Sequence, residues 1–410
     1  MQTFFTSDFF RGNRQRLRAE VGTDAPIVFA ANGLLQRGAD SNYSFCQDAN
    51  FWYLTGIAEP DLYLVIDGAE EYLIVPPRDD SRTAFDGIVD FSDLTKKSGI
   101  SQVVNTGTGW RKLRDRIKET NKVATVAAPP AYIERYGLYA NPARQTLHLK
   151  LAEISPKLEI KDIGRDIVYL RMIKQPKELA AIQAAIDITL KTIKDVTKKP
   201  KLAKYSQEYQ IEADIFAGFR SQGASGHAFE PIVAGGKQAC TLHYVANNAA
   251  LSEGELIVID VGAEVEHYAA DITRTVAKGE VSPRAQQVHA AVIDVQKYAY
   301  SLLMPGVLLR DYEKKIENYM GKKLIELGLI KDIEQDNVRD FYPHSTSHFL
   351  GLNVHDVGDY DRPLEPGMVL TVEPGIYVPA EAIGVRIEDD VLITETGIKI
   401  LSKKSQPELL

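Results

Sequence analysis

The stretch that decides the fold is Leu256-Ile-Val-Ile-Asp260-Val261, an apolar β-like run that carries a carboxylate. Two further runs repeat the pattern, because Met368-Val-Leu-Thr-Val-Glu373 and Val385-Arg-Ile-Glu388 each end in an acid. A lone ionised carboxylate in such a run is costly to bury unless a cation pairs with it. With Asp271 and His348, these acids supply four carboxylates and one imidazole, a set that suits two divalent ions and metal-assisted hydrolysis.

Length and composition are those of a globular enzyme with two domains. The 410 residues suffice for two separate cores, and the net charge of −8 argues against a nucleic-acid or anionic-membrane surface. Cys46 and Cys240 are the only cysteines, which makes no disulfide framework and favours a cytoplasmic location. Because no stretch reaches ~18 uninterrupted apolar residues, we expect neither a signal peptide nor a membrane span.

The first part of the chain, residues 1–165, alternates short apolar runs with helical patterns and predicts an α/β domain. The segment 158–166 is rich in charge and contains Gly164, so we interpret it as an inter-domain linker. The expected strands are residues 25–31, 63–66, 72–76 and 123–127.

The second part, residues 166–410, predicts an α+β domain in which helices cover one antiparallel sheet and the acids point to its other face. Serine before an apolar run and proline in a first turn mark helix starts. The expected helices begin near Pro176, Ser206, Ser282 and Asp311.

Two acids, Asp260 and Asp271, flank a segment that would form a hairpin and bring them side by side. Thr273 and Thr275 share Asp271's side of the second strand and would orient it. Taken alone, the two residues favour a simpler interpretation, in which Asp271 caps a turn and Asp260 marks a strand end, because aspartate is common at turns. In the last run, strand alternation places Arg386 and Glu388 on one face, where the arginine would hold neighbouring carboxylates in place.

Three histidines, His344, His348 and His355, lie within twelve residues. A single such histidine is more often structural, but three together favour proton transfer or hydrogen bonding to a developing anion, and only one need bind metal. His243 by itself is equally typical of an ordinary core or surface position.

Glu373 is followed at once by Pro374-Gly375, a turn that ends its strand. A glutamate fixed there can bind a metal and act as general base, although an edge-strand surface position is the alternative. Glu388 follows the apolar alternation, whereas Asp389 and Asp390 are expected to leave the sheet as a solvated charge run.

Taken in order, several motifs resemble the creatinase/aminopeptidase P superfamily, which has the pita-bread catalytic fold. The nearest branch is that of aminopeptidase P and prolidase, which cleaves Xaa-Pro bonds. The resemblance covers nearly the whole chain. The matching segments are residues 37–60, 241–244, 259–262, 270–275, 347–358, 370–377 and 384–390.

The resemblance implies a role for each site residue. One metal would be held by Asp260, Asp271 and Glu388, and the other by Asp271, His348, Glu373 and Glu388. The histidines His243, His344 and His355 would bind substrate and handle protons, supported by Arg386, Tyr377 and Asp40. The family usually uses Mn(II), which suits an oxygen-rich site with one imidazole, while Co or Zn are alternatives.

Three positions depart from the family's usual pattern. Cys46 replaces a frequent arginine, Phe85 replaces a frequent tryptophan, and Val245-Ala-Asn-Asn248 replaces a more acidic stretch. None of them is an expected metal ligand. They bear on subunit contacts and peptide length, not on the chemistry.

The sequence therefore predicts a Xaa-Pro aminopeptidase with two divalent ions, acting on peptides with proline at the second position. The alternatives are a Xaa-Pro dipeptidase (prolidase), with the same ligands, and a peptide-binding pseudoenzyme, which the complete ligand set disfavours. Relatives associate through the N-terminal domain, so a homodimer is expected, with a homotetramer as the alternative.

Overall fold

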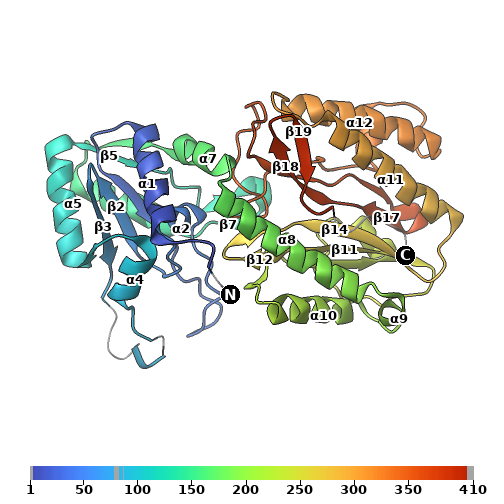
Figure 1. Ribbon diagram of the computed structural model, residues 1–410, viewed down its shortest axis with the longest axis horizontal. Coiled ribbons are helices and arrows are strands. Elements are labelled where there is room, and N and C mark those ends of the chain that lie inside the picture. The colour runs from blue at the N-terminus through green and yellow to red at the C-terminus, as the bar shows by residue number, and fades with distance from the viewer. Residues whose placement is uncertain (1–2, 78–82, 86, 404–410) are drawn as a thin grey trace. The chain divides into compact units, whose positions relative to one another are not determined.

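The computed structural model describes residues 3–77, 83–85 and 87–403. The chain divides into two compact units, Phe5–Leu170 and a second that begins at Arg171 and includes Phe4 (Figure 1). The expected boundary at 165/166 falls within α7 (Gly164–Met172), a helix that spans the division.

The first unit is built on a mixed six-stranded sheet in the order β4-β3-β2-β1-β5-β8. β1 pairs antiparallel with β2 and parallel with β5, so the connection to β5 must cross over through helices. The strands are β1 (Ile27–Ala30), β2 (Tyr63–Asp67), β3 (Glu70–Val75), β4 (Gln102–Asn105), β5 (Lys122–Thr125) and β8 (Glu159–Asp162), with a separate hairpin of β6 (Tyr132–Ile133) and β7 (Leu138–Tyr139). The helices are α1 (Ser7–Val21), α2 (Ala49–Thr55), α4 (Phe91–Ser98), α5 (Thr106–Thr120) and α6 (Ala143–Ile154).

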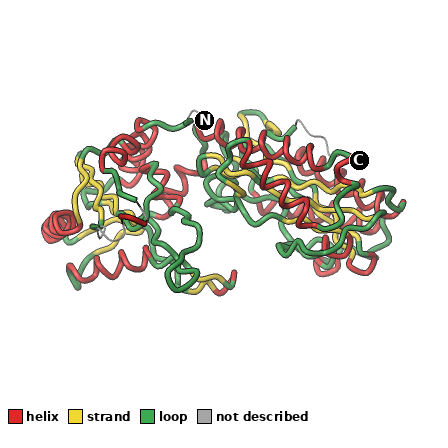
Figure 2. The backbone as a smooth tube through the Cα atoms, turned by 90° about the horizontal axis from the view of Figure 1, so that it is seen from below, coloured by secondary structure: helices red, strands yellow, loops and turns green. Residues whose placement is uncertain are grey.

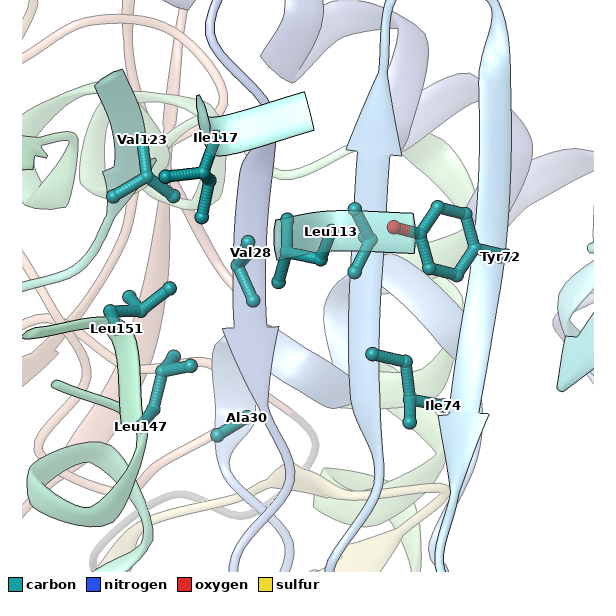
Figure 3. Close-up of a cluster of buried hydrophobic side chains, with 10 residues drawn as sticks. Val28, Ala30, Tyr72, Ile74, Leu113, Ile117, Val123, Leu147 and Leu151 are labelled. Carbon is teal, nitrogen blue, oxygen red and sulfur yellow. The ribbon is translucent and has the colours of Figure 1, made fainter. Parts of the chain in front are cut away.

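The core of this unit lies between one face of the sheet and two helices (Figure 3). Side chains from β1, β3 and β5 meet those from α5 and α6, and all are nearly inaccessible to solvent. The contributing residues include Val28, Tyr72, Ile74, Leu113, Ile117, Val123, Leu147 and Leu151. Apolar burial of this kind stabilises the α/β layering that the alternating pattern predicted.

The prediction of an inter-domain linker at residues 158–166 is wrong. Residues 159–162 form β8, the edge strand of the sheet, and α7 begins at Gly164. The side chains of β8 are all exposed, as on a solvated sheet edge, so an edge strand and a linker share the same charge-rich composition.

The second unit contains three small antiparallel sheets and one hairpin, covered by helices (Figure 2). The sheets have the orders β10-β11-β14, β13-β12-β9 and β15-β18-β19, and β16 pairs with β17. Their strands are β9 (Gly226–His227), β10 (Ile232–Gly235), β11 (Glu255–Val261), β12 (Ala263–Val265), β13 (Tyr268–Ala269), β14 (Ile272–Lys278), β15 (Val369–Val372), β16 (Gly375–Val378), β17 (Ile383–Arg386), β18 (Asp389–Thr394) and β19 (Gly397–Ile400). Antiparallel pairing and helical cover are confirmed, but the strands are divided among several sheets rather than joined in one.

The expected helices are present in this unit. Ser282 caps α11, since its side chain accepts a hydrogen bond from the Ala285 N–H. The second expected helix starts later than predicted, because Gln207 rather than Ser206 makes its capping box. The helices are α8 (Pro176–Val196), α9 (Lys199–Leu202), α10 (Glu208–Ser221), α11 (Pro283–Leu302), α12 (Leu309–Glu326) and α13 (Gln335–Arg339). Within the described ranges, no helix is both long and apolar enough to cross a membrane.

Candidate metal centre

The paired strands β11 and β14 bring the first two acids together. Asp260 lies on β11 opposite Thr273, and Asp271 immediately precedes β14. The short strands β12 and β13 occupy the connection, so it is longer than a simple hairpin but still returns Asp271 to the side of Asp260.

His348 and Glu373 reach the same place through a second pair of segments. The Thr371 N–H donates to the His348 carbonyl oxygen (3.0 Å), and the Glu373 N–H donates to that of Thr346 (2.8 Å). His348 Nδ1 lies 3.1 Å from the Phe349 carbonyl oxygen, which directs Nε2 toward the acids. That Nε2 is 3.3 Å from Glu373 Oε1 and 3.4 Å from Asp271 Oδ2.

Glu388 completes the group from the turn between β17 and β18. Its Oε2 accepts a hydrogen bond from the Thr273 hydroxyl (2.6 Å), and its N–H donates to the Thr273 carbonyl oxygen (3.1 Å). Ligand atoms of Asp271, His348 and Glu388 all lie within 4.8 Å of one another. We call Asp260, Asp271, His348, Glu373 and Glu388 the ligand cluster.

The two threonines serve neighbours of Asp271 rather than Asp271 itself. Thr273 holds Glu388, and the Thr275 hydroxyl donates to the Arg386 carbonyl oxygen (2.8 Å). The expectation that they orient Asp271 is therefore wrong.

The ligand cluster is a concentration of buried negative charge. Burial, followed by the neighbouring Asp260 and Glu373, raises the pKa of Asp271 well above its usual range. Burial and the adjacent acids do the same for Glu388. Burial raises the pKa of Glu373 to about 7.

These acids fit divalent cations. Asp260 Oδ1 and Glu388 Oε1 are buried and have no hydrogen-bond partner within the described part of the chain. A buried acceptor left unpaired is costly, and a cation at these oxygens would remove that cost while offsetting the repulsion between carboxylates. Carboxylate oxygens with one imidazole suit Mn(II) and related ions.

Arg386 supports the cluster, as its strand alternation predicted. Its Nη2 donates to Asp260 Oδ2 (2.6 Å) and its Nη1 to the Tyr377 hydroxyl (3.0 Å). The same hydroxyl lies 2.9 Å from His344 Nε2. A continuous hydrogen-bonded chain therefore joins His344 to Asp260, and it fixes the orientation of that carboxylate.

The acids after Glu388 do not leave the sheet. Asp389 and Asp390 begin β18 and are buried, so the expected solvated charge run is wrong. Asp389 pairs with Arg274 (2.7 Å), while Asp390 Oδ2 accepts the Asp271 N–H (3.2 Å). Both acids therefore belong to the framework behind the ligands, and only the tertiary pairing of β18 with β15 reveals this.

The remaining histidines differ in their surroundings. The His355 ring packs edge-on against His348 at 4.2 Å between centroids, and burial lowers its pKa to about 4. Burial and the nearby Arg386 lower the pKa of His344 to about 3. Both rings are therefore neutral at pH 7. The His243 side chain is exposed. It contributes to lowering the pKa of both His344 and His355, so the three histidines lie near one another.

Two anchors of the histidine loops were not identified from the sequence. Glu313 on α12 accepts the backbone N–H groups of Thr346 (2.9 Å) and Ser347 (3.1 Å), immediately before His348. Burial raises the pKa of Glu313 to about 7. A lone glutamate on an amphipathic helix gives no sequence signal for such a role.

The second anchor is Asp356, which follows His355 directly. Its buried carboxylate is bonded to Arg171 and lies 3.5 Å from Lys174 Nζ. We call Arg171, Lys174 and Asp356 the salt-bridge cluster. Burial lowers the pKa of Lys174, an effect that the Asp356 charge opposes.

The remaining expected residues are divided between the two units. Asp40 is exposed in the first unit, as are Cys46 and Phe85. Tyr377 is buried on β16, where it contacts Arg386 and His344.

The chain is similar to known protein families and to several named proteins. The family described as "Aminopeptidase P, N-terminal domain" matches residues 10–125, and the family described as "Metallopeptidase family M24" matches residues 180–395. Xaa-Pro aminopeptidase 3 of Homo sapiens is 32% identical, over 97% of this chain and 82% of its own. The Xaa-Pro aminopeptidase of Haemophilus influenzae is 34% identical, over 98% of this chain and 95% of its own.

A solved structure of aminopeptidase P from E. coli has a TM-score of 0.86 and 28% identity, covering 98% of this chain and 96% of its own. A zinc-substituted form of that enzyme in complex with product is similar to the same degree, with a TM-score of 0.87. Every member of the ligand cluster lies within the matched residues 180–395. The chain therefore belongs to metallopeptidase family M24.

Proposed function

We propose that this chain is a metal-dependent Xaa-Pro aminopeptidase, which removes the N-terminal residue of peptides that have proline second. The observation that carries the proposal is the ligand cluster, because four acids and one imidazole converge where few protein cations compensate them. The names of the relatives support the substrate class. Residues 1–165 would form the N-terminal domain and 166–410 the catalytic domain.

The ligand cluster would hold two divalent ions. Asp260, Asp271 and Glu388 would bind one, and Asp271, His348, Glu373 and Glu388 would bind the other. Bound ions of this kind supply Lewis-acid activation of a water and of the scissile carbonyl. Manganese is the proposed metal because oxygen donors dominate the set.

Glu373 would transfer the proton. Its carboxylate would take a proton from the attacking water and return it to the departing proline nitrogen. The Thr371 hydroxyl, 3.4 Å from Glu373 Oε1, and the Glu373 backbone bond to Thr346 hold the carboxylate in place.

The histidines would act on the peptide. His243 and His355 are exposed at the site, so either can donate a hydrogen bond to the carbonyl oxygen as negative charge develops there. His344 is held by Tyr377 and would contact the substrate with its orientation fixed, together with Arg386 behind it. Asp40 is proposed as an acid that the N-terminal domain contributes.

The test uses three peptides and two states of the protein. Ala-Pro, Ala-Pro-Ala and Ala-Ala-Ala are incubated with metal-stripped and Mn-loaded protein, and the released alanine is measured. We expect Mn-dependent cleavage of Ala-Pro-Ala and little cleavage of Ala-Ala-Ala. Cleavage restricted to Ala-Pro would favour the dipeptidase alternative. Full activity in protein shown to be metal-free would refute the proposal.

Assembly and location complete the proposal. We propose a cytoplasmic homodimer, with a homotetramer as the alternative, and no nucleic-acid or membrane partner. Light scattering tests the assembly, since a mass near the 45.6 kDa of one chain would exclude self-association.

A further inference from the structure

The loop of residues 241–250 carries His243 at the site and has little regular structure of its own. It leaves the short helix η2 (Gly236–Cys240) and returns to the start of α10, where Gln207 and Ala250 form an isolated bridge. The His243 side chain is exposed. Its position therefore depends on how the rest of the loop is anchored.

A single buried carboxylate holds both the part of the loop that follows His243 and the end of the strand that precedes η2. Glu208, the first residue of α10, is completely inaccessible to solvent. Its Oε2 accepts hydrogen bonds from the Tyr244 hydroxyl (2.8 Å) and the Ala249 N–H (2.8 Å). Its Oε1 accepts the Gly235 N–H (2.9 Å), at the end of β10. The loop and the strand before it are thus tied to one side chain.

A second anchor lies between these contacts. Asn247 is buried with a left-handed backbone (φ 44°). Its Oδ1 accepts the Val233 N–H (2.9 Å), and its Nδ2 donates to the Pro231 carbonyl oxygen (2.9 Å) and to Glu212 (3.0 Å). Asn247 fixes the middle of the loop to β10, whereas Glu208 contacts both Tyr244, next to His243, and Ala249 in the return segment.

We propose that Glu208 is a positioning residue for His243, an inference that rests on the proposed function of this histidine. A carboxylate offers only acceptors, and all three groups facing Glu208 are donors. An amide in its place would turn an N–H toward one of them and push the loop away. A displacement of about 1 Å at a reacting group can reduce the rate by about 100-fold.

The test is a double-mutant cycle between Glu208 and His243. We expect Glu208→Gln to lower kcat/KM for Ala-Pro-Ala by about 10- to 100-fold at full metal content. In a His243→Ala background the same substitution should change kcat/KM by less than about twofold, because its effect passes through the missing imidazole. Equal effects in both backgrounds would show a merely structural role and overturn the inference.

Two further variants keep the test decisive if Glu208→Gln does not fold. Tyr244→Phe removes one donor and retains the ring, and it should show the same dependence on His243 with a smaller loss. Tyr205→Phe is the matched control. It removes a comparable hydroxyl-to-carboxylate bond, to Asp214 on the same helix (2.6 Å), without touching the loop, and kcat/KM should be unchanged.

Amide hydrogen exchange separates failure of the inference from failure of the proposed function. Exchange in residues 241–250 should be faster in Glu208→Gln and Tyr244→Phe than in the wild type, whatever the substrate. If the wild type cleaves no Xaa-Pro peptide but this change is seen, the proposed function fails and the anchoring by Glu208 stands. If exchange in the loop is unchanged, the inference is wrong.

Discussion

The ligand cluster and the salt-bridge cluster are both largely buried in the second unit, and they are built in opposite ways. In the salt-bridge cluster one carboxylate, Asp356, meets two cations, Arg171 and Lys174. In the ligand cluster four carboxylates meet one arginine among the described residues, Arg386, which forms an ion pair with Asp260. The first cluster is compensated by its own chain, whereas the second carries an excess of negative charge.

This difference separates a structural site from a functional one. Buried ion pairs rarely add much net stability, but each partner becomes indispensable once the other is buried. The acids of the ligand cluster repel one another instead. Burial and this repulsion raise the pKa of Asp271 and of Glu388. A cation from outside the chain would offset this repulsion, and perturbed groups of this kind gather at active sites.

The largest expected effect concerns chemistry within the ligand cluster. Glu373→Gln keeps the shape of the side chain but removes the proton-accepting oxygen, so kcat for Ala-Pro-Ala should fall by about 100- to 10,000-fold. Steady-state kinetics with circular dichroism as a check on folding measures this. Glu395→Gln, at an exposed position in the turn after β18, is the control. Turnover near that of the wild type would exclude Glu373 as the base.

The next effect tests the compensated cluster. Asp356→Asn would leave Arg171 and Lys174 buried without their anion, and the free energy of unfolding should fall by about 3–5 kcal/mol. Denaturant titration measures it, with Asp361→Asn at an exposed position of the same segment as control. A loss no larger than that of the control would mean that the pairing with Asp356 contributes little.

The uncompensated cluster should respond in the opposite direction. In chelator-treated protein, Asp271→Asn removes one of several mutually repelling charges, so the free energy of unfolding should rise by about 1–2 kcal/mol. With Mn(II) the same variant should be less stable than the wild type, because a ligand to both proposed ions is lost. Thermal unfolding in both conditions, beside the exposed Asp340→Asn, decides this. A lower melting temperature for Asp271→Asn without metal would contradict the charge argument.

The smallest effect concerns a buried ionisable group outside both clusters. His289 on α11 is buried, and burial lowers its pKa to about 4. Below about pH 6.5 the His289 imidazole binds a proton in the unfolded chain, whereas in the folded chain it stays neutral until the pH approaches about 4. The free energy of unfolding therefore falls as the pH falls from about 6.5 to about 4.

We therefore expect His289→Gln to reduce the loss of unfolding free energy between pH 7 and pH 5 by roughly 1–2 kcal/mol. Denaturant titrations of chelated protein at the two pH values measure the difference. An identical pH dependence in the variant and the wild type would show that His289 does not contribute.

Much of the ligand cluster could be predicted because strand residues alternate between faces. An acid in an otherwise apolar strand must face something polar, which singled out Asp260, Glu373 and Glu388. The same alternation placed Arg386 beside Glu388, and the structure shows its contact with the Asp260 carboxylate. The prediction failed for Asp389 and Asp390, because a run of three acids has no alternation and gave no sign of the partners that bury it.

The sequence by itself determined the start of α8 and α11, the β-like runs and the ordered motifs of the family, since these depend on neighbouring residues. Tertiary structure alone decided which groups hold the loops. Glu208 and Glu313 accept hydrogen bonds from residues that are distant along the chain, and Asp356 forms an ion pair with such a residue. A surface carboxylate and a buried anchor have the same local pattern, and they differ only in the donors that folding brings to them.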